Sequence, residues 1–222
     1  DVFSTYLYTG NGSTLTINNG IDLSTNGGLV WLKGRSSPYS HCLTDTVQGR
    51  SKQLSSNNTN AANTAASNDG ITSFNANGFS LGGANTFYNT NVNNVTFASW
   101  TFRKQAKFFD VVTWSGDGTA QRAIAHSLGS APGCIIVKCT SDSTASDWIV
   151  WHRSLATTTS DLVLNTTAAQ ADYGLFGTTA PTSTNFYLGV STNGLVDYYN
   201  KTGDRKSTRL NSSHVALSRM PS

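Results

Sequence analysis

Short runs of alternating apolar and polar residues follow one another along most of the chain, with turn-forming residues between them. Such alternation is typical of β-strands, and Asn-Gly or Asp-Gly pairs favour the turns that join them. The expected strands of the first half are 3–8, 15–18, 29–33, 41–44, 71–74, 78–81 and 95–102. Those of the second half are 109–114, 122–125, 134–138, 148–152, 162–165 and 185–190. The pattern predicts an all-β protein.

The pattern of the first half returns in the second half. Residues 3–12 (FSTYLYTGNG) resemble 109–118 (FDVVTWSGDG), 28–33 resemble 133–138, 40–45 resemble 147–152, and 79–82 resemble 186–189. Four matches in the same order and at similar spacing indicate two tandem modules, residues 1–107 and 108–203. We expect each module to be an antiparallel β-sandwich, with Val30/Ile135 and Leu32/Val137 at matching inward positions.

The span 55–68 interrupts this pattern because it is rich in Asn, Thr and Ala. It is too polar to belong to a core, so we expect a long surface loop with room for one helical turn.

The last residues have a different character. Residues 204–214 read DRKSTRLNSSH, which is the translation of a common short-read sequencing adaptor, and 218–222 (SRMPS) match its continuation. We therefore expect 204–222 to be a disordered adaptor-derived tail that packs on nothing, with the natural sequence cut near Gly203. The second module would then lack the strand equivalent to 95–102 and would be open at one sheet. The chain also begins directly in a strand-like segment, which we interpret as a truncation at that end.

Charge gives no indication of an anionic partner. The chain has 15 Lys and Arg residues against 12 acidic residues, but four of the basic residues and one acidic residue lie in 204–222. The rest carries eleven of each, so the sequence predicts neither nucleic acid nor an anionic membrane as a partner. No apolar run is long enough to span a membrane, and no secretory signal is recognisable.

Several segments together carry a resemblance to a known group of proteins. They are 29–33 (LVWLK), 39–41 (YSH), 44–49 (TDTVQG), 72–82 (TSFNANGFSLG) and 98–100 (ASW). In this order they resemble a domain family of tail and other virion proteins of environmental, especially marine, bacteriophages. The strand order around 77–82 is similar to concanavalin A-like, laminin-G-type jelly rolls.

The resemblance implies a virion structural or adhesion module, on a tail fibre or a capsid. The expected location is the virion, and the expected partners are other virion proteins, a host-surface polysaccharide and further copies of the chain. The alternative is a carbohydrate-binding accessory domain of a bacterial carbohydrate-active enzyme. Tail, portal or terminase genes beside the coding sequence would favour the first interpretation.

Known catalytic patterns are missing from the sequence. It contains no Glu and no closely spaced Asp pair, so the paired carboxylates of sandwich glycosidases have no candidates. It also contains no Gly-x-Ser-x-Gly elbow and no Walker loop. We therefore expect a protein that is not an enzyme and has no cofactor.

Metal and thiol chemistry are not indicated either. His41, His126 and His152 lack metal-ligand spacing, and we interpret Cys42, Cys134 and Cys139 as free thiols in buried strands. A calcium site at Asp45, Asp69, Asp117 or Asp161 is conceivable in a jelly roll, but no EF-hand loop is present, so we expect no metal.

The aromatic residues divide into two groups. The five Trp residues lie in predicted strands, where core packing is the expectation. Five others lie in connections rich in Gly, Ser and Asn, where they could stack on sugar rings or fold back over the edge of a sandwich. These candidate ligand-binding residues are Tyr39, Phe87, Tyr88, Tyr173 and Phe176.

Overall fold

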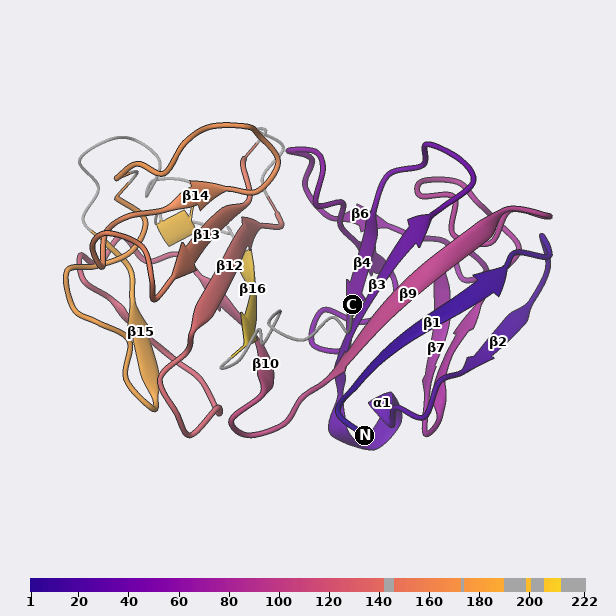
Figure 1. The fold of residues 1–222 in the computed structure, drawn as a ribbon, viewed down its shortest axis with the longest axis horizontal. Helices are drawn as coiled ribbons and strands as arrows, with labels where there is room; N and C mark the ends of the chain where they lie inside the picture. The colour runs from indigo at the N-terminus through magenta and orange to yellow at the C-terminus, as the bar shows by residue number, and fades with distance from the viewer. Residues whose placement is uncertain (142–145, 173, 190–198, 201–205, 213–222) are drawn as a thin grey trace, which may run out of the picture.

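The computed structural model describes residues 1–141, 146–172, 174–189 and 199–200, and the backbone of 206–212. Its described part is mostly β, with several antiparallel sheets, one short helix and no closed barrel. The two halves of the chain lie side by side, each with its own strands (Figure 1). None of the described helices is long and apolar enough to cross a membrane.

The first half forms a four-stranded sheet in the order β1-β9-β3-β4 and a three-stranded sheet in the order β2-β8-β7. Strands β5 and β6 form a small third sheet. The elements are β1 (Phe3–Thr9), β2 (Leu15–Asn18), α1 (Leu23–Asn26), β3 (Gly28–Gly34), β4 (Cys42–Asp45), β5 (Lys52–Gln53), β6 (Asn63–Thr64), β7 (Ile71–Asn75), β8 (Gly78–Leu81) and β9 (Thr96–Arg103).

The second half forms a five-stranded sheet in the order β10-β16-β12-β13-β14 and a pair β11-β15. The strands are β10 (Phe109–Ser115), β11 (Ala123–Ala125), β12 (Cys134–Cys139), β13 (Ile149–His152), β14 (Leu162–Val163), β15 (Asn185–Tyr187) and β16 (Lys206–Ser212). Each of the thirteen strands expected from the hydrophobic pattern overlaps one of these strands. The sequence pattern did not predict α1, β5, β6 and β16.

The main sheets of the two halves share one register. Phe102 on β9 stands opposite both Phe3 and Leu29, and Ser212 on β16 stands opposite both Phe109 and Cys134. Phe3 therefore corresponds to Phe109 and Leu29 to Cys134, as in the sequence repeat. The four expected inward residues are buried, Val30 and Leu32 in a cluster of the first half and Ile135 and Val137 in one of the second.

The expectation of a tail without partners is wrong for Lys206–Ser212. This segment pairs with β10 over seven residues and with β12 over six, in the place that β9 occupies in the first half. The second half therefore does not lack its inner strand. Strands β10 and β12 both turn rows of N–H and C=O groups toward this place, and backbone pairing satisfies them whatever side chains the segment carries. Residues 213–222 lie outside the described part of the chain.

The span 55–68 also differs from expectation, because it contacts the second half instead of solvent alone. The Ser55 carbonyl accepts a hydrogen bond of 2.8 Å from the Trp148 indole, and the Thr59 carbonyl accepts one of 3.0 Å from Lys138 Nζ. Its polar residues use their backbone groups to hold the halves together. Beside it lies a third apolar cluster, which we call the junction cluster: Leu29, Leu43, Leu54, Phe109, Val111 and Trp148.

The repeated Leu-Gly sequence has a steric cause. A Cβ atom on Gly82 would lie 1.8 Å from the Asn68 carbonyl oxygen, and one on Gly189 would lie 2.1 Å from that of Gly174. Both glycines also donate a backbone hydrogen bond to the crossing segment, Gly82 to Gly70 and Gly189 to Leu175. Two chains can cross this closely only where one of them has no side chain.

The position of β16 predicts a strong effect of proline within it. Leu210→Pro removes a backbone N–H from an inner strand, so we expect a loss of roughly 1–3 kcal/mol of stability for each backbone group left unpaired. The matched control, Leu210→Val, keeps the N–H and should retain stability. Hydrogen exchange should show slow exchange across 206–212, β10 and β12 that Leu210→Pro accelerates. Fast exchange across 206–212 in the unmodified chain would contradict the pairing.

Candidate functional site

The outer face of the first half's main sheet carries a partly exposed aromatic surface. Trp31 on β3 stands opposite Trp100 on β9, and their ring centroids are 6.3 Å apart at an edge-to-face angle of 74°. Exposed Thr5 and Leu7 on β1 continue the same face next to Trp100 and Ala98. We call Trp31, Trp100 and the adjoining His41 the aromatic platform.

His41 fixes the orientation of the platform. The Trp31 indole N–H donates a hydrogen bond of 2.8 Å to His41 Nδ1, and the two rings meet edge to face. The acceptor nitrogen must be unprotonated, so the ring hydrogen is on Nε2. Burial of the imidazole, followed by the charge of Lys33, lowers the pKa of His41 below its usual 6.5. Both effects favour the neutral ring that the indole requires.

Polar groups border the platform at His41. Asn57 Oδ1 accepts hydrogen bonds from the His41 backbone N–H at 2.9 Å and from the Ser55 hydroxyl at 2.8 Å, and Asn57 Nδ2 donates to the Ser40 hydroxyl at 3.2 Å. Asn57 is itself exposed. The arrangement combines flat apolar rings with amide and hydroxyl groups at one edge, as ligand sites for amphipathic molecules do.

The described residues at the equivalent positions of the second half do not form such a platform. In the shared register Trp31 corresponds to Ile136 and His41 to Trp148. Trp148 is 2% exposed in the junction cluster, and Ile136 packs against the same cluster. At these two positions the outer face of the second half packs at the junction, and Trp31 also touches this cluster but keeps part of its ring exposed.

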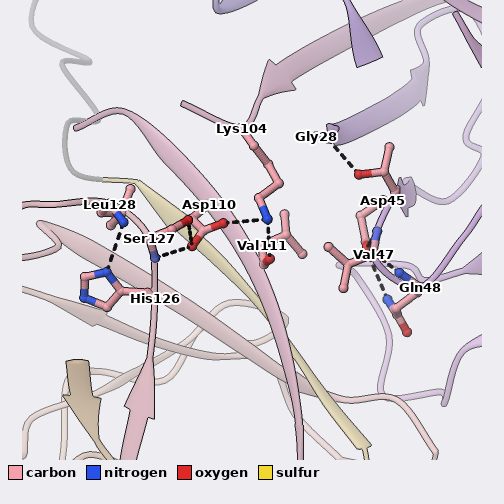
Figure 2. Close-up of polar contacts among 11 residues, drawn as sticks. Gly28, Asp45, Val47, Gln48, Lys104, Asp110, Val111, His126, Ser127 and Leu128 are labelled. Atoms are coloured by element: carbon pink, nitrogen blue, oxygen red, sulfur yellow. Dashed lines mark hydrogen bonds and ion pairs between the residues drawn. The ribbon is translucent and has the colours of Figure 1, made fainter. Parts of the chain in front are cut away.

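A polar network lies beside this junction, on the linker from β9 to β10 (Figure 2). Lys104 Nζ forms an ion pair of 3.0 Å with Asp110, and the Ser127 backbone N–H and hydroxyl both donate to the other Asp110 oxygen at 2.9 Å. Figure 2 also shows Asp45 at the end of β4, whose carboxylate accepts hydrogen bonds from Val47 and Gln48.

The two carboxyl groups have opposite pKa shifts. Burial raises the pKa of Asp45 more than its hydrogen bonds to Gln48 and Val47 lower it. Burial also acts to raise the pKa of Asp110, but the Ser127 hydrogen bonds and the Lys104 charge together hold it below the usual 3.8. Asp110 is thus an ionised, paired carboxylate, and its surroundings suit a structural joint between the halves.

The five candidate residues chosen from the sequence are not brought together as a site. Tyr88 is buried in the apolar cluster of the first half, and Tyr39 is half-buried against the same cluster. Phe176 is buried in the cluster of the second half. Phe87 is 43% exposed, and Tyr173 lies outside the described residues. Of the four described candidates, only Phe87 presents an exposed ring.

The described residues contain no group of three or more His, Cys, Asp or Glu side chains placed to hold a metal ion. The Asp45 carboxylate accepts hydrogen bonds from the backbone N–H groups of Val47 and Gln48 in its own turn. Asp117 forms an ion pair of 3.2 Å with Arg122. Cys42 and Cys139 are buried, and Cys134 is partly buried.

Comparison with known proteins gives one match. A family model described as a domain of unknown function, DUF7483, matches residues 1–202. The chain belongs to this family. No curated protein and no solved structure matches the chain. The DUF7483 match contains the aromatic platform, the junction cluster and every strand except β16.

His41 predicts a pH dependence of the DUF7483 domain. Because its pKa is lowered by folding, the unfolded chain binds the proton more readily, so stability should fall as the pH drops below 6.5. The loss should stop once the folded imidazole is also protonated. Thermal unfolding of the wild type and His41→Gln from pH 8 to pH 5 should show a smaller decline in the variant. Equal slopes would mean that His41 does not contribute.

Lys104 predicts a second dependence on pH. Lys104→Met leaves Asp110 without its cation, and because Lys104 is partly exposed we expect a loss of roughly 1–3 kcal/mol at pH 7. A carboxyl with a lowered pKa stabilises the fold above 3.8 and loses that effect as the pH falls. The difference between wild type and variant should therefore shrink toward pH 3. A difference that persists at pH 3 would contradict the ion-pair explanation.

Proposed function

We propose that this DUF7483 chain is a virion structural or adhesion module that binds a polysaccharide on the aromatic platform. The observation that carries the proposal is the partly exposed pair Trp31 and Trp100 beside His41 and Asn57. Sugar rings present apolar C–H faces and a rim of hydroxyls. Indole rings can cover the apolar faces, and amide, imidazole and hydroxyl groups can form hydrogen bonds with the sugar hydroxyls.

The fold within this proposal is a pair of jelly-roll sandwiches of the concanavalin A-like type. The shared strand order and register of β1-β9-β3-β4 and β10-β16-β12-β13 support it, as do the separate apolar clusters of the two halves. The resemblance of the sequence to bacteriophage tail and virion proteins supports the virion context.

The role that we propose is binding without catalysis, with one glycan site in each chain. Duplication of the module would suggest two sites, but the equivalent face of the second half is covered at the junction. Any gain from multivalency must then come from several chains displayed together.

Glycan binding by the full chain tests this proposal. Array screening should identify a polysaccharide, and calorimetry should give one site per chain. Trp31→Ala and Trp100→Ala should each weaken binding at least about tenfold, as truncation of an aromatic hot spot does. Phe87→Ala is the matched control, because this exposed ring lies in a loop away from the platform residues in sequence, and it should bind normally. If Phe87→Ala abolishes binding and the Trp variants do not, the loop aromatics form the site and the platform does not.

A further inference from the structure

A buried carboxylate without a partner lies in the first half, away from the platform. Asp69 is 0% exposed, and neither of its side-chain oxygens has a hydrogen-bond partner in the described part of the chain. The two ion pairs among the described residues do not involve it. Burying an ionised carboxylate without compensation costs several kcal/mol, so a cation bound beside Asp69 would stabilise this position.

A second unpartnered polar group lies next to it. Gln53 on β5 is also 0% exposed, and among the described residues neither its amide oxygen nor its amide nitrogen has a hydrogen-bond partner. A Cβ atom added to Gly70 would lie 1.8 Å from Gln53 Nε2, so the amide occupies the space beside the residue that follows Asp69. Unpartnered buried polar groups are rare in folded proteins, and two at neighbouring residues indicate a common ligand.

The surrounding backbone holds the two side chains in place. Asp69 forms a β-bridge with Ala84, and the Gly82 N–H donates to the Gly70 carbonyl at 2.9 Å. Gln53 is fixed on the other side by its pairing with Asn63 on β6. The donors therefore come from separate segments that backbone pairing brings together.

From this arrangement we propose that Asp69 and Gln53 bind a calcium ion within the first half. The carboxylate and the amide oxygen are hard ligands, which Ca²⁺ prefers, and Ca²⁺ commonly completes its shell with backbone carbonyls and water. Mg²⁺ fits less well because it demands near-octahedral geometry and dehydrates reluctantly. Cys42 is close enough for the charge of Asp69 to affect it, but burial above all raises the pKa of its thiol to about 12. The protonated thiol offers no thiolate to a soft metal.

Calcium binding to the full chain, after treatment with a chelator, is the direct test. Calorimetry should show one Ca²⁺ per chain with a Kd on the order of 10⁻⁴ to 10⁻³ M, the range of extracellular calcium modules. Terbium luminescence excited through the aromatic residues should rise and be displaced by Ca²⁺. The midpoint of thermal unfolding should rise with Ca²⁺ and much less with the same concentration of Mg²⁺.

Two variants and one control assign the effect to these residues. Asp69→Asn keeps the shape and removes the charge, so Ca²⁺ binding should weaken at least about tenfold. Gln53→Glu adds a second carboxylate and should tighten binding by about tenfold. Asp1→Asn removes an exposed carboxylate and should leave binding unchanged.

Three results would overturn the proposal. They are the absence of saturable Ca²⁺ binding, binding that survives Asp69→Asn unchanged, and equal stabilisation by Mg²⁺. An Asp69→Asn chain more stable than a wild type that binds no Ca²⁺ would show that Asp69 destabilises the fold and holds no cation.

Discussion

The backbone hydrogen bonds of one inner strand are the constraint on which each half of this protein depends. In both main sheets the first and third strands do not touch each other, and a strand from far along the chain pairs with both. β9 has this place in the first half and β16 in the second, at equivalent registers. Every other strand of the main sheet is positioned through this pairing, because an antiparallel ladder leaves no choice of face once one pair is fixed.

The register also decides which surface remains free. The odd-numbered residues of β3 point outward. Where the second half packs on this face, Leu29 is part of the junction cluster. The part of this face that is only partly covered contains Trp31, Trp100 and His41, and Trp31 itself packs against the edge of the junction cluster. The same sheet thus provides both the joint between the halves and the surface that we assign to ligand binding, and the span 55–68 contacts both.

The local part of this structure could be predicted from sequence, and the part that depends on distant segments could not. Alternation gave the strands of both halves, and the repeat gave their equivalence, because both signals lie within a few residues. β16 was missed because 204–222 were interpreted as an adaptor-derived tail, and the one apolar residue of the strand, Leu210, gave no alternating pattern against that interpretation. The platform was missed for a related reason. Alternation places Trp31 on the face of Lys33, which indicates partial exposure, but which part of this face stays open is decided by the other half.

The close crossings at Gly82 and Gly189 have a consequence for how the two copies can diverge. Any substitution at these positions adds a side-chain carbon that would overlap a carbonyl oxygen of the crossing segment. Both copies should therefore keep glycine at this position, however far the sequences of the surrounding strands change. A glycine directly after a Phe-x-Leu strand could therefore identify further copies of the module in chains whose other residues no longer align.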